Sequence, residues 1–118
     1  MNTLINNRVR LIQHIYKYNY TKTYKGVVRY TSSKDVSRIF DLIKELALYE
    51  KAPEQVTNTV EILHHDLFVD TICEAIVAVE KGTVHGFALF YISYSTWKGR
   101  SLYLEDFYVI EDQRKRGI

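Results

Sequence analysis

Leu-Tyr-Leu-Glu-Asp-Phe-Tyr-Val-Ile, residues 102–110, is the stretch on which the fold prediction depends. Leucine, aromatic and β-branched residues dominate it, which predicts a strand covered on both faces. It nevertheless carries two adjacent acids, Glu105 and Asp106, and an ionised carboxylate in apolar surroundings is costly unless it is hydrated, paired or used. A short acidic turn and a basic, glycine-ended segment follow at residues 111–118. That succession is typical of a strand leading into a helix whose amino-terminal end can hold phosphate.

The chain before this stretch predicts a strand and then a long amphipathic helix. Residues 26–31 are expected to form the strand, and residues 32–35 a capping box in which Ser32 is the N-cap and Asp35 reaches back. The helix should run to about Tyr49. Its apolar residues recur at three- and four-residue spacing, namely Val36, Ile39, Phe40, Ile43, Leu46 and Ala47.

A second helix and a meander of strands are predicted next. Pro53 breaks the first helix, and residues 57–61 (Thr-Asn-Thr-Val-Glu) open a weaker one whose apolar side is Val60, Leu63 and Leu67. Residues 74–80 and 84–94 predict an antiparallel hairpin around a short glycine turn. A further turn at residues 97–100 leads into the strand 102–110. The expected fold is therefore α/β (α+β), with a mostly antiparallel sheet and the order β-α-α-β-β-β.

Length and composition indicate one domain. The chain has 118 residues, of which 47% are hydrophobic. No apolar run approaches the roughly 20 residues that cross a bilayer, and the amino terminus lacks the pattern of a signal peptide. The single cysteine, Cys73, fits a reducing compartment and is expected in the core rather than as a nucleophile. We therefore expect a cytoplasmic protein with no membrane partner.

Charge is distributed unevenly along the chain. Residues 1–30 hold six basic residues and no acid, whereas residues 31–112 hold all 14 acids and seven bases. Three more basic residues lie near the carboxyl end. An acidic body would attract a cationic substrate, and a local basic cluster suits phosphates. The alternative is an ordinary acidic surface.

The first 25 residues permit two interpretations. Their basic residues alternate with tyrosines, a pattern that could stack on and neutralise nucleic acid. They could instead be an amino-terminal extension outside a domain that spans residues 26–118. The acidic body argues against a broad nucleic-acid-binding face, so a small non-catalytic interaction protein is kept only as the alternative function.

No metal site is predicted. His64 and His65 are adjacent, and neighbours on a helix point in different directions, unlike the i, i+4 pair of a zinc helix. We expect both to be solvated helix residues.

Two motifs carry a resemblance to a known family. Residues 104–109 and 113–118 resemble the central strand and the acetyl-CoA pyrophosphate loop of the GCN5-related N-acetyltransferases (GNAT). The loop pattern is Arg/Gln-x-x-Gly-x-Gly/Ala, and residues 114–118 supply all of it except the closing small residue. With Tyr49-Glu50 after the long helix and residues 94–100 before the strand, the chain is similar to the diamine (spermidine/spermine) and thialysine acetyltransferase branch over residues 26–118.

The resemblance implies acetyl-CoA as cosubstrate and a small cationic amine as acceptor. Amines with a pKa of about 10 are almost wholly protonated at neutral pH, so the attacking nitrogen must lose a proton. Glu105 is the expected base, acting through ordered water, with a pKa raised by desolvation in the apolar strand. The alternative is a structural acid paired with a basic partner.

The resemblance also implies an amine-binding site. In a regular strand Asp106 would point away from the face of Glu105, so both can face the substrate only if the strand bulges, as it does in the family. Asp106 would then bind a remote ammonium, with Tyr49, Glu50 and Trp97 lining the site by charge and cation–π contact. The alternatives are an exposed helix end for Tyr49 and Glu50 and a packing anchor for Trp97.

Cofactor contacts are implied for two backbone segments. In the family a strand N–H polarises the thioester carbonyl, which points to Phe107, Tyr108 and Val109. Backbone amides of the loop would hold the pyrophosphate, and that loop comprises Arg114, Lys115, Arg116, Gly117 and Ile118.

The motif stops inside the pyrophosphate loop, which predicts an amino-terminal portion of such a domain. We expect weak or absent turnover from this portion, and an unpaired edge strand could instead support a homodimer. Ser95 stands where polyamine-specific members tend to carry an acid. A thialysine-like acceptor and a short diamine therefore both stay open.

Overall fold

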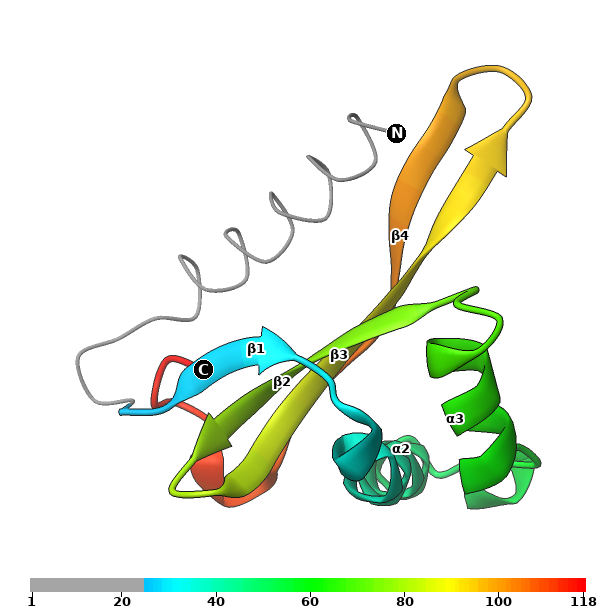
Figure 1. Ribbon diagram of the computed structural model, residues 1–118. Coiled ribbons are helices and arrows are strands. Elements are labelled where there is room, and N and C mark those ends of the chain that lie inside the picture. The colour runs from blue at the N-terminus through cyan, green and yellow to red at the C-terminus, as the bar shows by residue number, and fades with distance from the viewer. Residues whose placement is uncertain (1–24) are drawn as a thin grey trace.

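The computed structural model describes residues 25–118, which form a four-stranded sheet and two helices (Figure 1). The helices and strands in chain order are β1 (Val27–Tyr30), α2 (Val36–Tyr49), α3 (Val60–Phe68), β2 (Glu74–Glu80), β3 (Thr83–Ser95) and β4 (Gly99–Val109). The sheet order is β1-β2-β3-β4, and each neighbouring pair is antiparallel. The predicted α/β class and the order of elements are confirmed.

The first helix begins as the capping box predicts. The backbone N–H of Ser32 donates to Asp35 Oδ2 at 2.7 Å, and a single 3₁₀ turn, Ser33–Asp35, precedes α2. Arg29 of β1 donates to both carboxylate oxygens of Asp35, at 2.8 and 3.1 Å. This pair lowers the pKa of Asp35, chiefly through the arginine hydrogen bond. One buried acid therefore ties the first strand to the first helix.

The second helix begins within the predicted opening segment, residues 57–61. Its N-cap is Thr59, whose Oγ1 accepts a hydrogen bond from the backbone N–H of Ile62 at 3.1 Å. Leu63 and Leu67 face the core as expected.

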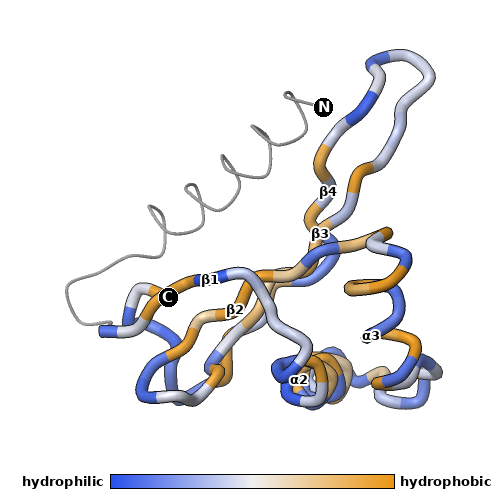
Figure 2. Tube along the Cα trace, in the orientation of Figure 1, coloured by the Kyte–Doolittle hydropathy of each residue, from blue (hydrophilic) through white to orange (hydrophobic). Residues whose placement is uncertain are grey.

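Both helices cover the same face of the sheet (Figure 1), and the main core lies between them and that face. Figure 2 shows apolar residues along the sides of α2 and α3 that meet the strands. The core residues from the helices are Val36, Ile39, Phe40, Leu42, Leu63 and Leu67, and those from the strands include Ala75, Val77, Val84, Phe87, Leu89 and Tyr108. Alternate strand residues form a second cluster made of Ile76, Ala88 and Phe90, with Val28 and Leu102 packed against it.

Two glycines set the geometry of the strand pairings. Lys81 and Gly82 both have positive φ, 53° and 76°, and they form the two-residue turn between β2 and β3. Gly86 lies where β3 and β4 approach closely, since an added Cβ would sit 2.8 Å from the carbonyl oxygen of Tyr108. A bulge at His85 accompanies this approach, because Ala78 pairs with Gly86 and Val79 with Val84.

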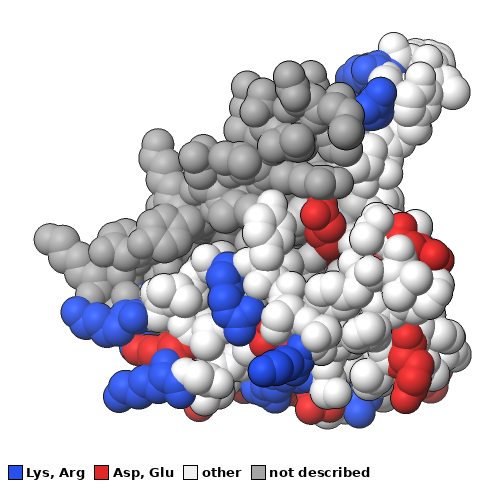
Figure 3. Space-filling view, in the orientation of Figure 1, with Lys and Arg blue, Asp and Glu red and all other residues white. Residues whose placement is uncertain are grey.

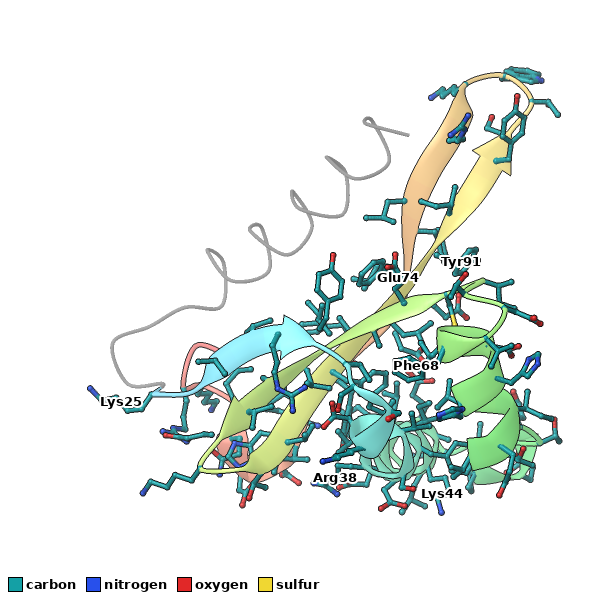
Figure 4. All side chains as sticks on the ribbon, in the orientation of Figure 1. Lys25, Arg38, Lys44, Phe68, Glu74 and Tyr91 are labelled. Atoms are coloured by element: carbon teal, nitrogen blue, oxygen red, sulfur yellow. The ribbon has the colours of Figure 1, made fainter. Side chains whose placement is uncertain are left out.

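β4 differs from the prediction. It begins at Gly99 rather than at Leu102, and only Tyr108 within it is buried, so the expectation of a strand covered on both faces is wrong. The physical reason is position: β4 is the edge strand of the described sheet, with a neighbour only at β3. The outer part of the β3–β4 hairpin projects beyond both helices as an arm (Figure 1), and Tyr91 lies where β3 leaves the helix-covered part (Figure 4).

No helix within residues 25–118 is long and apolar enough to cross a membrane. The basic, tyrosine-rich segment singled out for nucleic acid lies outside the described residues, apart from Lys25.

Candidate active site

A bulge in β4 organises the candidate site. Leu89 pairs with Asp106 and the next residue of β3, Phe90, pairs with Leu104, so Glu105 is an extra residue that has no partner on β3. This is the irregularity that the two adjacent acids require, because a bulge changes the alternation of side chains along a strand. The bulge thus lies at the predicted position.

The two acids of the bulge have different surroundings. Glu105 is exposed, so the expectation of an acid desolvated by an apolar strand is wrong for its side chain. Asp106 is partly buried, and burial raises its pKa, with the charges of Glu105 and then Glu50 as further causes. The side chain of Asp106 has no ion-pair or hydrogen-bond partner among residues 25–118. The desolvated acid of the pair is therefore Asp106.

Glu50 brings the end of α2 into this acidic site. Its backbone N–H still donates to Leu46 at 2.9 Å, which places it at the helix C-cap. Its charge acts on Asp106. The charges of Glu50 and Glu105, from two elements, thus both act on Asp106, and such an acidic site favours a cation.

Tyr49 contacts the loop rather than the acids. The guanidinium of Arg114 lies 5.3 Å from the ring centre of Tyr49 and 5.3 Å from that of Tyr108. Arg114 Nε also donates to the carbonyl of Val109 at 2.7 Å. One arginine therefore joins the end of α2 to the end of β4. The sequence did not predict this role of Arg114. Residues 49 and 114 are distant in the chain, and neither residue type indicates the other as its partner.

The loop after β4 is also attached to β2. It starts with a 3₁₀ turn, Glu111–Gln113, and Arg116 donates to both carboxylate oxygens of Glu80 at 2.7 and 3.1 Å. The hydrogen bond from Arg116 is the main cause that lowers the pKa of Glu80. Lys115 and Gly117 have positive φ, 67° and 84°. The sequence did not predict the contact of Glu80 with Arg116 either, because no sequence pattern marks an acid at the end of a strand as a partner of this loop.

Trp97 is not brought to the acidic site. It lies in the turn between β3 and β4 at the end of the arm, and its side chain is 93% exposed. Six residues of β4 separate the turn from Glu105, which is roughly 20 Å at about 3.3 Å per residue. Figure 3 shows basic atoms on the arm, and Lys98 and Arg100 are the charged residues of that region. The assignment of Trp97 to the amine site stays a prediction.

The segment proposed for cofactor binding fits an anionic ligand in two respects. Lys115 is exposed and its ammonium has no hydrogen-bond or ion-pair partner among residues 25–118, so a cation is available beside the loop backbone. Gly117 has positive φ, a backbone conformation that is common where N–H groups approach an anion closely. The edge strand continues after the bulge with Phe107, Tyr108 and Val109. The cofactor roles of these three residues and of residues 114–118 stay predictions.

The remaining singled-out residues lie elsewhere. Cys73 packs against the main core just before β2, and burial raises the pKa of its thiol, so it lies where the sequence predicts. The two neighbouring histidines diverge: the ring of His64 is 5.2 Å from that of Phe68, whereas His65 Nδ1 lies 3.3 Å from Asp70 Oδ2.

The bulged strand, the acids beside it and the basic glycine loop after it are features of an α/β transferase domain. The Acetyltransferase (GNAT) family model matches residues 36–118. Two curated relatives are similar to the chain. Thialysine N-epsilon-acetyltransferase of Bos taurus is 41% identical over 101 residues, covering 78% of this chain and 59% of that protein. Spermidine/spermine N(1)-acetyltransferase-like protein 1 of Homo sapiens is 36% identical over 100 residues, covering 77% of this chain and 14% of that protein.

A solved structure agrees with the fold. The crystal structure of a predicted acetyltransferase with acetyl-CoA from Clostridium acetobutylicum superposes with a TM-score of 0.58 at 19% identity, covering 79% of this chain and 65% of that one. The chain belongs to the acetyltransferase (GNAT) family. It spans 59% of the length of the bovine relative.

Proposed function

We propose that this chain provides the amine site and the start of the cofactor loop of an acetyl-CoA-dependent N-acetyltransferase. The acceptor is a small cationic amine of the thialysine or short-diamine kind. The observation that carries the proposal is the bulge at Glu105, which gathers acids from β4 and from the end of α2 immediately before a basic glycine loop. The relatives' names support the acceptor class.

The chemistry divides between the acids. Glu105, exposed at the bulge, takes the proton of the attacking ammonium through water, because only the neutral amine has a free electron pair. Asp106 and Glu50 hold a second positive charge of the acceptor. Bound acetyl-CoA would supply an activated thioester: the neutral amine nitrogen would form a bond to the carbonyl carbon, the carbon–sulfur bond would break, and the departing thiolate would take up the second proton that the nitrogen releases.

Acceptor binding should depend on pH through Asp106. Its pKa is raised in the folded chain, so the acid is protonated, and unable to hold a cation, at a higher pH than an ordinary aspartate. A bound ammonium favours the carboxylate, and acceptor binding therefore releases a proton at pH values near the raised pKa of Asp106. The KM for the amine should rise as pH falls through this range.

The test separates binding from transfer. Acetyl-CoA binding is measured by calorimetry, and acetyl transfer is measured with thialysine, a short diamine and spermidine. In Glu105→Gln we expect transfer to fall by about 100-fold, within the range typical of a lost general base, while acetyl-CoA affinity is unchanged. Asp41→Asn removes the same charge from the exposed side of α2 and should change neither quantity.

Two results would count against the proposal. Absence of acetyl-CoA binding by the unaltered chain would remove the cofactor assignment. Unchanged transfer in Glu105→Gln would remove the base assignment and direct attention to Asp106, the desolvated acid of the pair.

A further inference from the structure

The loop after β4 carries three consecutive basic residues, and their surroundings differ. Arg114 is engaged by two tyrosine rings and by the carbonyl of Val109. Arg116 is engaged by Glu80 and by the side-chain oxygen of Gln113. Lys115, between them, is exposed. The basic cluster that the sequence assigns as a whole to phosphate is thus divided by the structure.

The conformation of Lys115 needs support. Its φ of 67° lies in the left-handed region, which is unfavourable for a non-glycine residue. Such a conformation persists where the surroundings hold it. The two arginines that flank Lys115 are attached to different parts of the sheet, one to the end of β4 and one to the end of β2. They therefore hold the backbone on both sides of the strained residue.

The Arg116–Glu80 contact is unfavourable to break. The two bonds at 2.7 and 3.1 Å form a bidentate pair, and the Glu80 side chain is only 11% exposed. If Arg116 turned to a ligand phosphate, this carboxylate would lose its bidentate partner. Figure 1 shows the loop, in red, beside the end of the sheet where β2 turns into β3.

We propose that Arg116 is a positioning residue of the cofactor loop, not a phosphate ligand: its pair with Glu80 fixes the loop that presents Lys115 and the loop N–H groups to an anion. This inference rests on the proposed function for the identity of the anion, the pyrophosphate of acetyl-CoA. The loop-holding role itself is a property of the chain without ligand.

A double-mutant cycle tests the assignment. Glu80→Gln, Arg116→Gln and the double variant are compared for acetyl-CoA affinity by calorimetry. We expect each single variant to weaken binding by the same factor, about threefold as for a partly exposed ion pair, and the double variant to be no weaker than either. Lys115→Gln should weaken binding and reduce its dependence on salt, whereas Arg116→Gln should leave the salt dependence unchanged.

A second measurement needs no ligand. Amide hydrogen exchange of residues 114–118 should be faster by a similar factor in Glu80→Gln and in Arg116→Gln, because both release the loop. Asp41→Asn changes net charge as Glu80→Gln does, and exchange in the loop should stay as in the unaltered chain.

The outcomes distinguish the role of Arg116 in holding the loop from the binding of acetyl-CoA by this chain. If Glu80→Gln binds acetyl-CoA more tightly, or if only Arg116→Gln weakens binding, Arg116 contacts the phosphates and the inference is overturned. If the unaltered chain binds no acetyl-CoA, the proposed function fails for this chain. The inference is then decided by exchange, and unchanged exchange in both single variants overturns it.

Discussion

β2 and β4 are both mainly apolar strands, but their surroundings differ. Both consist mainly of apolar residues, yet Ala75 to Ala78 of β2 are buried whereas one residue of the eleven in β4 is. β2 has strands on both sides and helices over one face, whereas β4 pairs only with β3 in the described sheet. An apolar composition therefore predicts that a segment is a strand, and the position of that strand in the sheet decides how much of it is covered.

The same contrast holds for two aspartates. Asp35, on the helix side, is almost wholly buried and has a bidentate arginine, which lowers its pKa. Asp106, on β4, is partly buried beside other acids, which raises its pKa. The acid that stabilises the fold is paired, and the acid at the candidate site is available for a cationic ligand.

The largest expected effect is the loss of stability when a buried phenylalanine is truncated, with an exposed phenylalanine as the comparison. Phe90 of β3 is fully buried and Phe107 of β4 is 41% exposed. Phe90→Ala should lower the free energy of unfolding by about 3–5 kcal/mol, the usual cost of such a cavity, and Phe107→Ala by about 1 kcal/mol. Chemical denaturation measures both. Equal losses would mean that β4 is packed as tightly as β3, and the comparison between interior and edge would fail.

Gly86→Ala tests the close approach between β3, inside the sheet, and β4, at its edge. The new methyl group would meet the carbonyl oxygen of Tyr108 at 2.8 Å, and backbone yields less than a flexible side chain. We expect a loss of about 2 kcal/mol in unfolding free energy. Gly82→Ala is the control: it meets no atom within 4 Å, and its φ of 76° should cost about 1 kcal/mol. A smaller loss for Gly86→Ala than for Gly82→Ala would contradict the close approach.

Asp35→Asn tests the paired acid. It should lower the unfolding free energy at neutral pH by about 1 kcal/mol, a value reduced because Arg29 is partly exposed. The folded-state pKa of Asp35 is depressed, so its contribution is present above the unfolded pKa and is lost as pH falls through the folded one. Denaturation curves from neutral to acid pH should therefore converge for the two proteins. Parallel curves would show that the pair contributes nothing.

Asp106→Asn should have the smallest effect, and the opposite sign. Because the folded-state pKa of Asp106 is raised, the folded chain is favoured by protonation, and this contribution is lost as pH rises through the raised pKa. Removing the charge should increase stability at neutral pH by less than about 1 kcal/mol, while acceptor binding weakens. A loss of stability would show that Asp106 is paired, and would remove its difference from Asp35.

The local elements were predictable because their signals are local. The helix from Val36 to Tyr49 follows from apolar spacing and from a cap at Ser32, all within one continuous segment. The β2–β3 hairpin follows from two apolar runs around Lys81 and Gly82. The bulge at Glu105 could be expected only through the family resemblance, since two adjacent acids indicate an irregular strand without specifying which residue is extra.

By itself the sequence determined the order of elements, the place of the acids and the basic loop, because hydrophobic period, caps and turns act between near neighbours. The tertiary structure alone decided that Asp106 is the desolvated acid, that Trp97 lies far from it, and that Arg114 and Arg116 are held by Tyr49 and Glu80. Burial and charge pairing depend on which distant segments meet in space, and neither spacing nor composition within one segment carries that information.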